Sequence, residues 1–128
     1  MTSVEVPYSI ACALPTLGVV DVTNEVARSV AEADVDHGIA FVTAAGDRAL
    51  VRIQERESGF FTDLEGLLGR LVPLDLPERE RLLSFLLGPR TEQIPFSERK
   101  LCLGRWQRVL VVGFGERFEG DWTLTLIG

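Results

Sequence analysis

LCLGRWQRVLVVGF, residues 101–114, is the most strongly patterned segment of this chain. It is rich in β-branched and aromatic residues, contains no proline and is bounded by glycines, which predicts one long β-strand. Side chains alternate along a strand, so both faces are apolar, with Val109 and Val111 on one and Leu110, Val112 and Phe114 on the other. Such a strand is usually central, covered on both sides by other elements or by another subunit. Gln107 is the exception, an amide among apolar neighbours.

The size and charge of the chain narrow the class of protein. With 128 residues, 46% of them hydrophobic, residues 1–128 are expected to form a single domain with a real core. The 13 basic and 19 acidic residues give a net charge of -6, and no basic stripe of the kind that binds nucleic acid is present. No apolar run reaches the roughly 18 residues of a membrane span, and the N-terminus lacks a secretory signal. The sequence therefore predicts a cytoplasmic protein with neither nucleic-acid nor membrane partners.

The residues that usually bind metals are scarce. Cys12 and Cys102 lie far apart and match no metal-ligand spacing, so both are predicted to be buried thiols. His37 is the only histidine; it lies beside Asp36 just before an apolar strand, which favours a loop or turn position over a catalytic base. A histidine-rich zinc site is excluded on this count. We expect no metal and no cofactor.

The first half of the chain reads as strands around one helix. Residues 3–13 and 19–22 predict extended segments, with Pro7 typical of an edge strand. Thr23 is suited to be the N-cap of a helix that continues to about Asp34. Residues 38–45 and 49–54 then predict a hairpin-like pair of strands.

The second half predicts two more helices and two more strands. Ser58 is the expected cap of a helix that Pro73 ends, and a further helix is expected from about Asp75 to Gly88. That last helix is expected to bury Leu82, Leu83, Phe85, Leu86 and Leu87. Residues 92–96 predict a short extended segment, and residues 121–126 predict a strand with one apolar, buried face. Together these elements indicate an α+β fold, with a mainly antiparallel sheet or a two-sheet sandwich and three helices.

The order of these features resembles the YjbQ family, the secondary thiamine-phosphate synthase-like proteins. The resemblance covers nearly the whole chain and is most specific in Leu101–Gln107, with its pattern Leu-x-Leu-Gly-x-Trp-Gln. The other matching segments are Asp21-Val22-Thr23, Gly38, Gln54-Glu55-Arg56-Glu57, Asp63-Leu64-Glu65, Leu71-Val72-Pro73, Leu87-Gly88-Pro89 and Ile94-Pro95. The resemblance implies a small sandwich-like fold, a homotrimer and a polar pocket near the subunit boundary.

The chain departs from the family pattern at the residues that carry its chemistry. The family's His-Thr-Thr-Ala motif begins eight residues after the strand-opening glycine, where this chain has Gly46, Asp47, Arg48 and Ala49. A second family histidine lies seven residues before the Leu-Gly glycine and corresponds to Arg81. The family's glutamate falls at Gly113. We therefore expect no activity of the family's kind.

The candidate pocket residues are those that the family keeps and those that replace its histidines. They are Gln54, Glu55, Asp63, Gln107, Arg48 and Arg81. Three hypotheses follow: a trimer that binds a small anionic ligand without catalysis, an enzyme with a reduced site, and a purely structural or interaction trimer. In the second, Glu55 or Asp63 acts as base and Gln107 orients the substrate. The two arginines favour the first hypothesis if they face the pocket, and a structural ion network if Glu55 and Asp63 neutralise them.

Overall fold

The computed structural model describes residues 2–4, 9–115, 118 and 120–128, with side chains from residue 14 onward. Within these residues the chain forms three helices: α1 (Thr23–Glu32), α2 (Ser58–Leu71) and α3 (Arg79–Leu87). The strands of the same residues are β1 (Thr2–Val4), β2 (Ser9–Leu14), β3 (Leu17–Asp21), β4 (His37–Ala44), β5 (Ala49–Gln54), β6 (Thr91–Ser97), β7 (Lys100–Leu101), β8 (Arg108–Phe114) and β9 (Trp122–Ile127).

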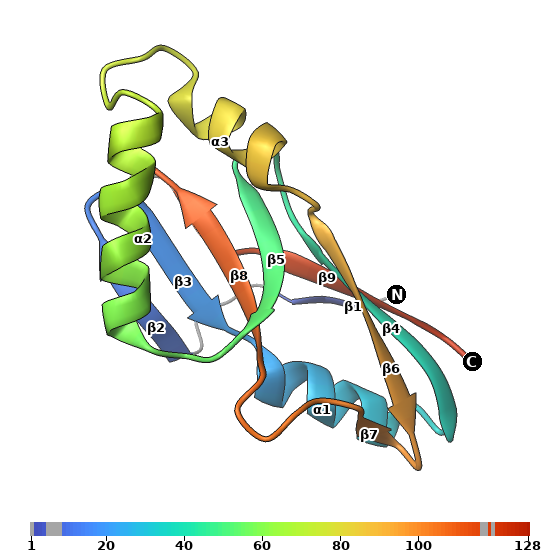
Figure 1. The fold of residues 1–128 in the computed structure, drawn as a ribbon. Helices are drawn as coiled ribbons and strands as arrows, with labels where there is room; N and C mark the ends of the chain where they lie inside the picture. The colour runs from blue at the N-terminus through green and yellow to red at the C-terminus, as the bar shows by residue number, and fades with distance from the viewer. Residues whose placement is uncertain (1, 5–8, 116–117, 119) are drawn as a thin grey trace.

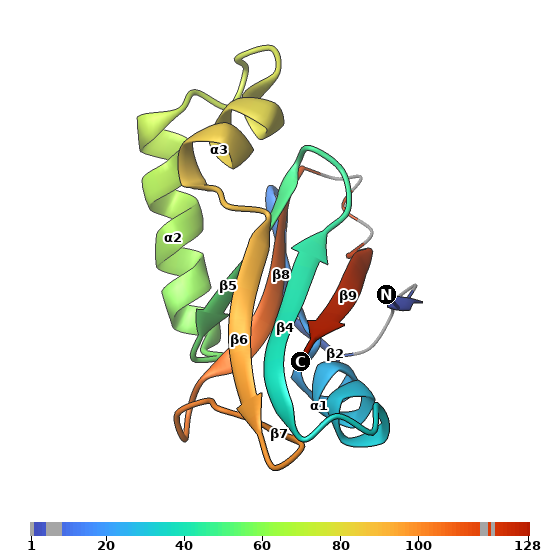
Figure 2. The same ribbon diagram turned by 90° about the vertical axis from the view of Figure 1, so that its right-hand side faces the viewer.

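The strands form two antiparallel sheets that face each other. The larger sheet has the order β1-β9-β4-β6-β7, and the smaller one has the order β2-β3-β8-β5. Helices α2 and α3 cover the outer side of the smaller sheet, while α1 lies at one end of the two sheets (Figures 1 and 2). The predicted α+β fold with antiparallel sheets and three helices is confirmed.

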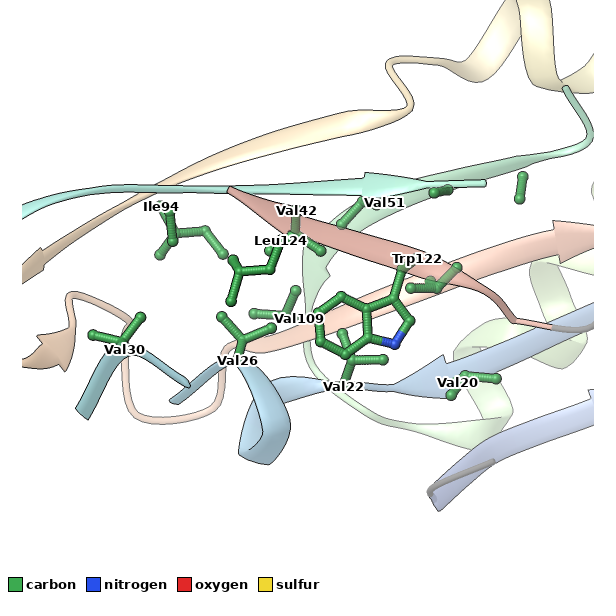
Figure 3. Close-up of a cluster of buried hydrophobic side chains, with 14 of the residues drawn as sticks. Val20, Val22, Val26, Val30, Val42, Val51, Ile94, Val109, Trp122 and Leu124 are labelled. Carbon is green, nitrogen blue, oxygen red and sulfur yellow. The ribbon is translucent and has the colours of Figure 1, made fainter. Parts of the chain in front are cut away.

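Strand β8 lies at the centre of this arrangement, as its apolar faces predict. Val109 and Val111 contribute to a core between the two sheets, where Trp122, Leu124 and Val42 also lie (Figure 3). Leu110, Val112 and Phe114 contribute to a second core under α2 and α3, together with Phe61, Leu68 and Leu83. Both faces of β8 are therefore covered by elements of the same chain.

The predicted strand over residues 101–114 is nevertheless too long. Residues 102–107 form a crossing between β7 in the larger sheet and β8 in the smaller one. A turn marks the crossing: the Gln107 amide N–H donates to the Gly104 carbonyl, and Gly104 N–H donates to Gln107 Oε1 over 2.6 Å. Gln107 is thus exposed and satisfies a turn, since the chain must leave one sheet to enter the other.

The expected burial of Cys102 is also wrong, because Cys102 lies in the same crossing and is exposed. The side chain of Cys12 lies outside the described residues.

The hairpin expected between residues 38–45 and 49–54 is wrong for a similar reason. Strand β4 pairs with β6 and β9, whereas β5 pairs with β8 in the other sheet. The turn after Ala44 therefore joins two sheets. The N-terminal strand expected over residues 3–13 is divided as well, between β1 in the larger sheet and β2 in the smaller one, and Pro7 lies outside the described residues.

The helices begin differently from the expectation. Thr23 is the first residue of α1 and does not cap it; the Asp21 carboxylate accepts its N–H instead. Glu57, not Ser58, caps α2, accepting from the N–H groups of Gly59 and Phe60. Helix α3 starts at Arg79 after Glu78, whose φ of 63° is left-handed, and therefore begins later than the expected start near Asp75.

Helix α3 buries less than its composition suggests. Leu83 is 1% exposed and packs in the second core, but Leu82, Phe85 and Leu86 are 38%, 85% and 61% exposed. The helix has nine residues, and only one of its faces meets the smaller sheet. The expected burial of these three side chains is wrong.

Candidate functional site

A pocket of about 670 Å³ opens where several loops meet beside α3. Its walls come from the β2–β3 turn, the β4–β5 loop, the start of α3 and the residues after β8. The polar lining consists of Thr16, Asp47, Arg48, Glu80 and Asp121, and aromatic lining comes from Phe114 and Phe118. Concave sites with a few polar groups on an otherwise apolar wall are typical of small-molecule pockets.

Backbone hydrogen bonds hold the β4–β5 loop in this position. Ala45 N–H donates to the Asp121 carbonyl over 2.9 Å, and Phe114 N–H donates to the Arg48 carbonyl over 3.0 Å. The Arg90 guanidinium donates to the Gly46 carbonyl over 2.7 Å. Gly46 itself has a φ of +84°, which favours glycine. The loop is therefore attached to both β8 and β9 rather than free to rearrange.

Asp47 links the two arginines that replace family residues. Arg81 Nε lies 2.9 Å from Asp47 Oδ2, and Arg48 Nε lies 4.0 Å from Asp47 Oδ1. Arg81 also contacts Glu78 at 3.3 Å. Arg81 lines a neighbouring hollow of about 640 Å³ together with Phe85 and Arg90, while Arg48 lines the main pocket. The carboxylates that pair with these arginines are Asp47 and Glu78, not Glu55 or Asp63.

The ring of Phe118 forms one wall of the pocket. It lies over Gly18 and Gly113, which are paired across β3 and β8. A Cβ atom at either position would overlap the ring, so the two glycines make the space that the ring fills. The ring covers Gly113, the position that the resemblance is expected to place at the family's glutamate.

Thr16 fixes the pocket's edge to α2. The Glu65 carboxylate accepts from Thr16 N–H over 2.8 Å and from the Thr16 hydroxyl over 2.7 Å. Hydrogen bonds to an ionised acceptor are stronger than neutral ones. Glu65 therefore holds the β2–β3 turn against the helix.

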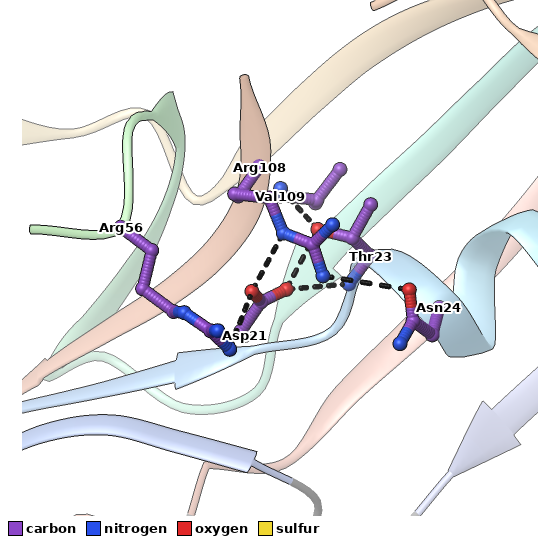
Figure 4. A network of polar contacts seen from close by, with 6 residues as sticks. All are labelled: Asp21, Thr23, Asn24, Arg56, Arg108 and Val109. Carbon is purple, nitrogen blue, oxygen red and sulfur yellow. Dashed lines mark hydrogen bonds and ion pairs between the residues drawn. The ribbon is translucent and has the colours of Figure 1, made fainter. Parts of the chain in front are cut away.

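A second polar group lies at the other end of the smaller sheet, around the buried carboxylate of Asp21 (Figure 4). Arg108 Nε donates to Asp21 Oδ2 over 2.7 Å, and Arg56 lies 3.4 Å from the same oxygen. The Thr23 hydroxyl donates to Asp21 Oδ1 and accepts from Val109 N–H, each within 2.8 Å. The group joins β3, α1, β8 and the segment after β5.

The pKa of Asp21 lies below its ordinary value of 3.8. Burial raises this pKa, but hydrogen bonds from Arg108 and Thr23, with the charge of Arg108, outweigh it. Asp21 is therefore held as a carboxylate that is fully engaged in joining these elements.

The six candidate residues fall into two groups. Arg48 lines the pocket and Arg81 lies beside it. Gln54 is at the far end of β5, in register with Arg108, and Glu55 follows it. A strand of this length spans roughly 17 Å. Gln107 is in the exposed turn before β8, and Asp63 is exposed on α2. One protomer therefore does not bring all six together.

His37 begins β4 at an exposed position, where its Nδ1 lies 3.1 Å from Ser97 Oγ. It takes no part in the pocket lining among the residues described. In the same residues no group of three or more histidine, cysteine, aspartate or glutamate side chains is placed to hold a metal ion.

Sequence reasoning missed Glu80, Asp121 and Phe118 as pocket residues. Glu80 is the neighbour of Arg81, and Asp121 precedes a predicted strand. Only these positions in the sequence could have indicated that the two residues line a pocket.

Among the described residues, the helices are all too short or too polar to span a membrane.

Solved structures of low sequence identity share this fold. An uncharacterised conserved protein of the yjbq/upf0047 family from Clostridium acetobutylicum is 22% identical, with a TM-score of 0.82 over 99% of this chain and 100% of that one. A hypothetical protein from Aeropyrum pernix K1 is 23% identical, with a TM-score of 0.80 over 98% of this chain and 96% of that one.

Sequence comparison gives the family directly. A UPF0047 protein from Archaeoglobus fulgidus is 30% identical over 105 residues, which cover 75% of this chain and 80% of that protein. The family model described as UPF0047 protein YjbQ-like matches residues 12–128. The chain belongs to the YjbQ-like UPF0047 family.

Proposed function

We propose that this chain is a small-ligand-binding member of its family that has lost the family's histidine chemistry. The observation that carries the proposal is the place of the pocket. It is lined by Gly46 and Arg48, flanked by Arg81 and covered at Gly113 by Phe118. These positions align with the histidine motif, the second histidine and the glutamate of the family. The pocket therefore lies at these positions and contains no histidine in its described lining.

Arg48 is the residue best suited to hold an anionic group of such a ligand. Its side chain is 51% exposed and lines the pocket, and its one ion pair among the described residues is a 4.0 Å contact with Asp47. A guanidinium presents a planar fork of donors that suits phosphate or carboxylate. Arg81 is less suited, because Asp47 and Glu78 already contact it.

An enzyme with a reduced site is the second candidate, and one observation favours it. Glu80 puts a carboxylate in the pocket, which is a possible general base, whereas Glu55 and Asp63 lie outside it. Under this alternative Glu80 takes the role that the sequence assigned to those two residues.

A homotrimer is supported by the uncovered face of the larger sheet. Figure 2 shows β6, β4 and β9 with no helix in front of them. Ile39 and Ile127, which are paired across β4 and β9, are 37% and 59% exposed on this face. Besides His37, the other outward residues of β4, β6 and β9 are uncharged: Phe41, Thr43, Thr91, Gln93, Pro95, Ser97, Thr123 and Thr125. An uncharged face on a chain of net charge -6 is suited to contact with another copy.

Anion binding at Arg48 is tested by thermal unfolding in rising phosphate or sulfate, against sodium chloride of equal ionic strength. A ligand that binds only the folded state raises the melting temperature with concentration. We expect this protection in the wild type and in Arg28→Ala, a control on the exposed face of α1, and its loss in Arg48→Ala. Arg81→Ala should retain most of it. Equal protection of the wild type and Arg48→Ala would exclude Arg48 as an anion ligand.

A further inference from the structure

Two carboxylates of the pocket have no counter-charge. Glu80 and Asp121 are both half-buried in the lining, and in the described part of the chain no side-chain hydrogen bond or ion pair involves either. Asp47 differs, because Arg81 holds it. Among the described residues, no side chain neutralises these two carboxylates by direct contact.

Glu80 is built into the pocket wall. One of its carboxylate oxygens lies 2.7 Å from the point where a Cβ of Gly115 would stand, so the carboxylate rests directly on the backbone after β8. Gly115 has a φ of +89°, and its N–H donates to the Thr16 carbonyl over 3.2 Å. This wall is thus tied to the β2–β3 turn, which Glu65 fixes to α2.

The aromatic wall beside these carboxylates is equally fixed. Phe118 fills the space over Gly18 and Gly113 and packs against the core between the sheets, while Phe114 is 3% exposed in the second core on the other face of β8. The face of an aromatic ring attracts a cation within about 6 Å. Carboxylates and a ring face together match a positively charged group of modest size.

We propose that this pocket, on which the proposed function also rests, takes a small ligand carrying a protonated nitrogen, an amine or an amidine, held by Glu80 and Asp121 against the ring of Phe118. Entry of a neutral or anionic group beside the carboxylates would remove their water and leave their charge uncompensated, which is costly. A cation in the same place forms an ion pair with the carboxylates, which compensates for the water that they lose. Arg48 also lines the pocket and is the residue available to an anionic group of the same ligand.

Benzamidine and benzamide test the inference, since they are nearly the same shape and only benzamidine carries a charge. At pH 7.5 and fixed ionic strength, up to 20 mM benzamidine should raise the melting temperature of the wild type by several degrees and benzamide should not. Amide NMR signals of Gly46 and Gly115 should move with benzamidine, while those of α1 stay. Glu80→Gln should remove the difference between the two compounds, Asp121→Asn and Phe118→Leu should reduce it, and Glu32→Gln, a control on α1, should preserve it.

Each outcome decides the inference. Equal responses to the two compounds, or a benzamidine response that Glu80→Gln leaves unchanged, would overturn it. If phosphate protection through Arg48 persists while benzamidine has no effect, the ligand-binding function stands and the cationic ligand is wrong. If the wild type responds to neither phosphate nor benzamidine, both the ligand-binding function and the cationic ligand are wrong.

Discussion

The ring of Phe118 occupies the space that a side chain at position 113 would need. Gly113 lies opposite Gly18 in the β3–β8 pair, and the ring covers both. If Gly113 corresponds to the family's glutamate, as the resemblance implies, an aromatic ring takes the place of a carboxylate there. The glycine pair and the ring together shape this wall of the pocket.

Gly113→Ala should destabilise the protein by about 1 to 3 kcal/mol, the usual cost of overpacking a well-packed site. The added methyl group would displace the ring of Phe118, which lies directly over Gly113 and Gly18. Gly66→Ala is the control: Gly66 is inside α2 with open space around it, and alanine there should stabilise the helix by about 0.5 to 1 kcal/mol. Urea unfolding of both variants measures the difference. Equal stabilities would show that the ring does not depend on the glycine.

Glu57→Ala should destabilise the protein by about 1 kcal/mol, the typical value of a helix N-cap. The Glu57 carboxylate accepts two N–H groups of the first turn of α2, over 2.7 and 2.8 Å. Ser58→Ala, at the position that the sequence pattern favours as the cap, should change stability by a few tenths of a kcal/mol at most. A larger loss for Ser58→Ala than for Glu57→Ala in urea unfolding would contradict the cap assignment.

Asp21→Asn should destabilise the protein by about 2 to 4 kcal/mol near neutral pH. The substitution removes a buried carboxylate that accepts hydrogen bonds from Arg108 and Thr23. The pKa of Asp21 is lowered in the folded state, so its contribution is fully present above the ordinary value of 3.8. That contribution is lost as the pH falls from about 4 through the lowered pKa. The wild type should therefore lose stability relative to Asp21→Asn in this range. A constant difference between the two proteins from pH 7 to pH 2 would contradict the assignment.

Thiamine-phosphate synthase activity of the family's kind should be absent. A positioned acid or base contributes roughly 10² to 10⁴ in rate, and the aligned histidines are Gly46 and Arg81. Arg81 does not supply such a group itself, since it is an arginine paired with Asp47. Saturable turnover of the family's substrates by the purified protein would refute this expectation.

Much of the fold could be predicted because apolar alternation reports burial directly. The sequence pattern correctly predicted that both faces of β8 are buried from Val109 to Phe114. It also correctly predicted that α2 ends before Pro73. What failed was the assignment of strands to sheets. A run such as residues 101–114 carries no mark of the point where the chain crosses between sheets, because both parts remain apolar and extended.

The candidate site was less predictable, since it depends on loops that the tertiary fold brings together. Arg48 could be named as a candidate because the resemblance places it within a family motif of fixed spacing. Glu80 and Phe118 could not, because their place in the pocket follows from the packing of α3 and from the Gly18–Gly113 pair. Local sequence contains neither relationship.

Self-association through the larger sheet gives the last prediction. If the uncharged face joins the copies, Phe41→Glu on β4 should convert the trimer to monomer, because a charge at a buried apolar contact is left unpaired. Phe85→Glu is the matched control: Phe85 is 85% exposed on α3, away from that face, and should leave the trimer intact. Light scattering at micromolar concentration measures the mass of each variant, and circular dichroism checks that both are folded. Dissociation by Phe85→Glu and not by Phe41→Glu would move the interface to α3, and a monomeric wild type would remove the trimer altogether.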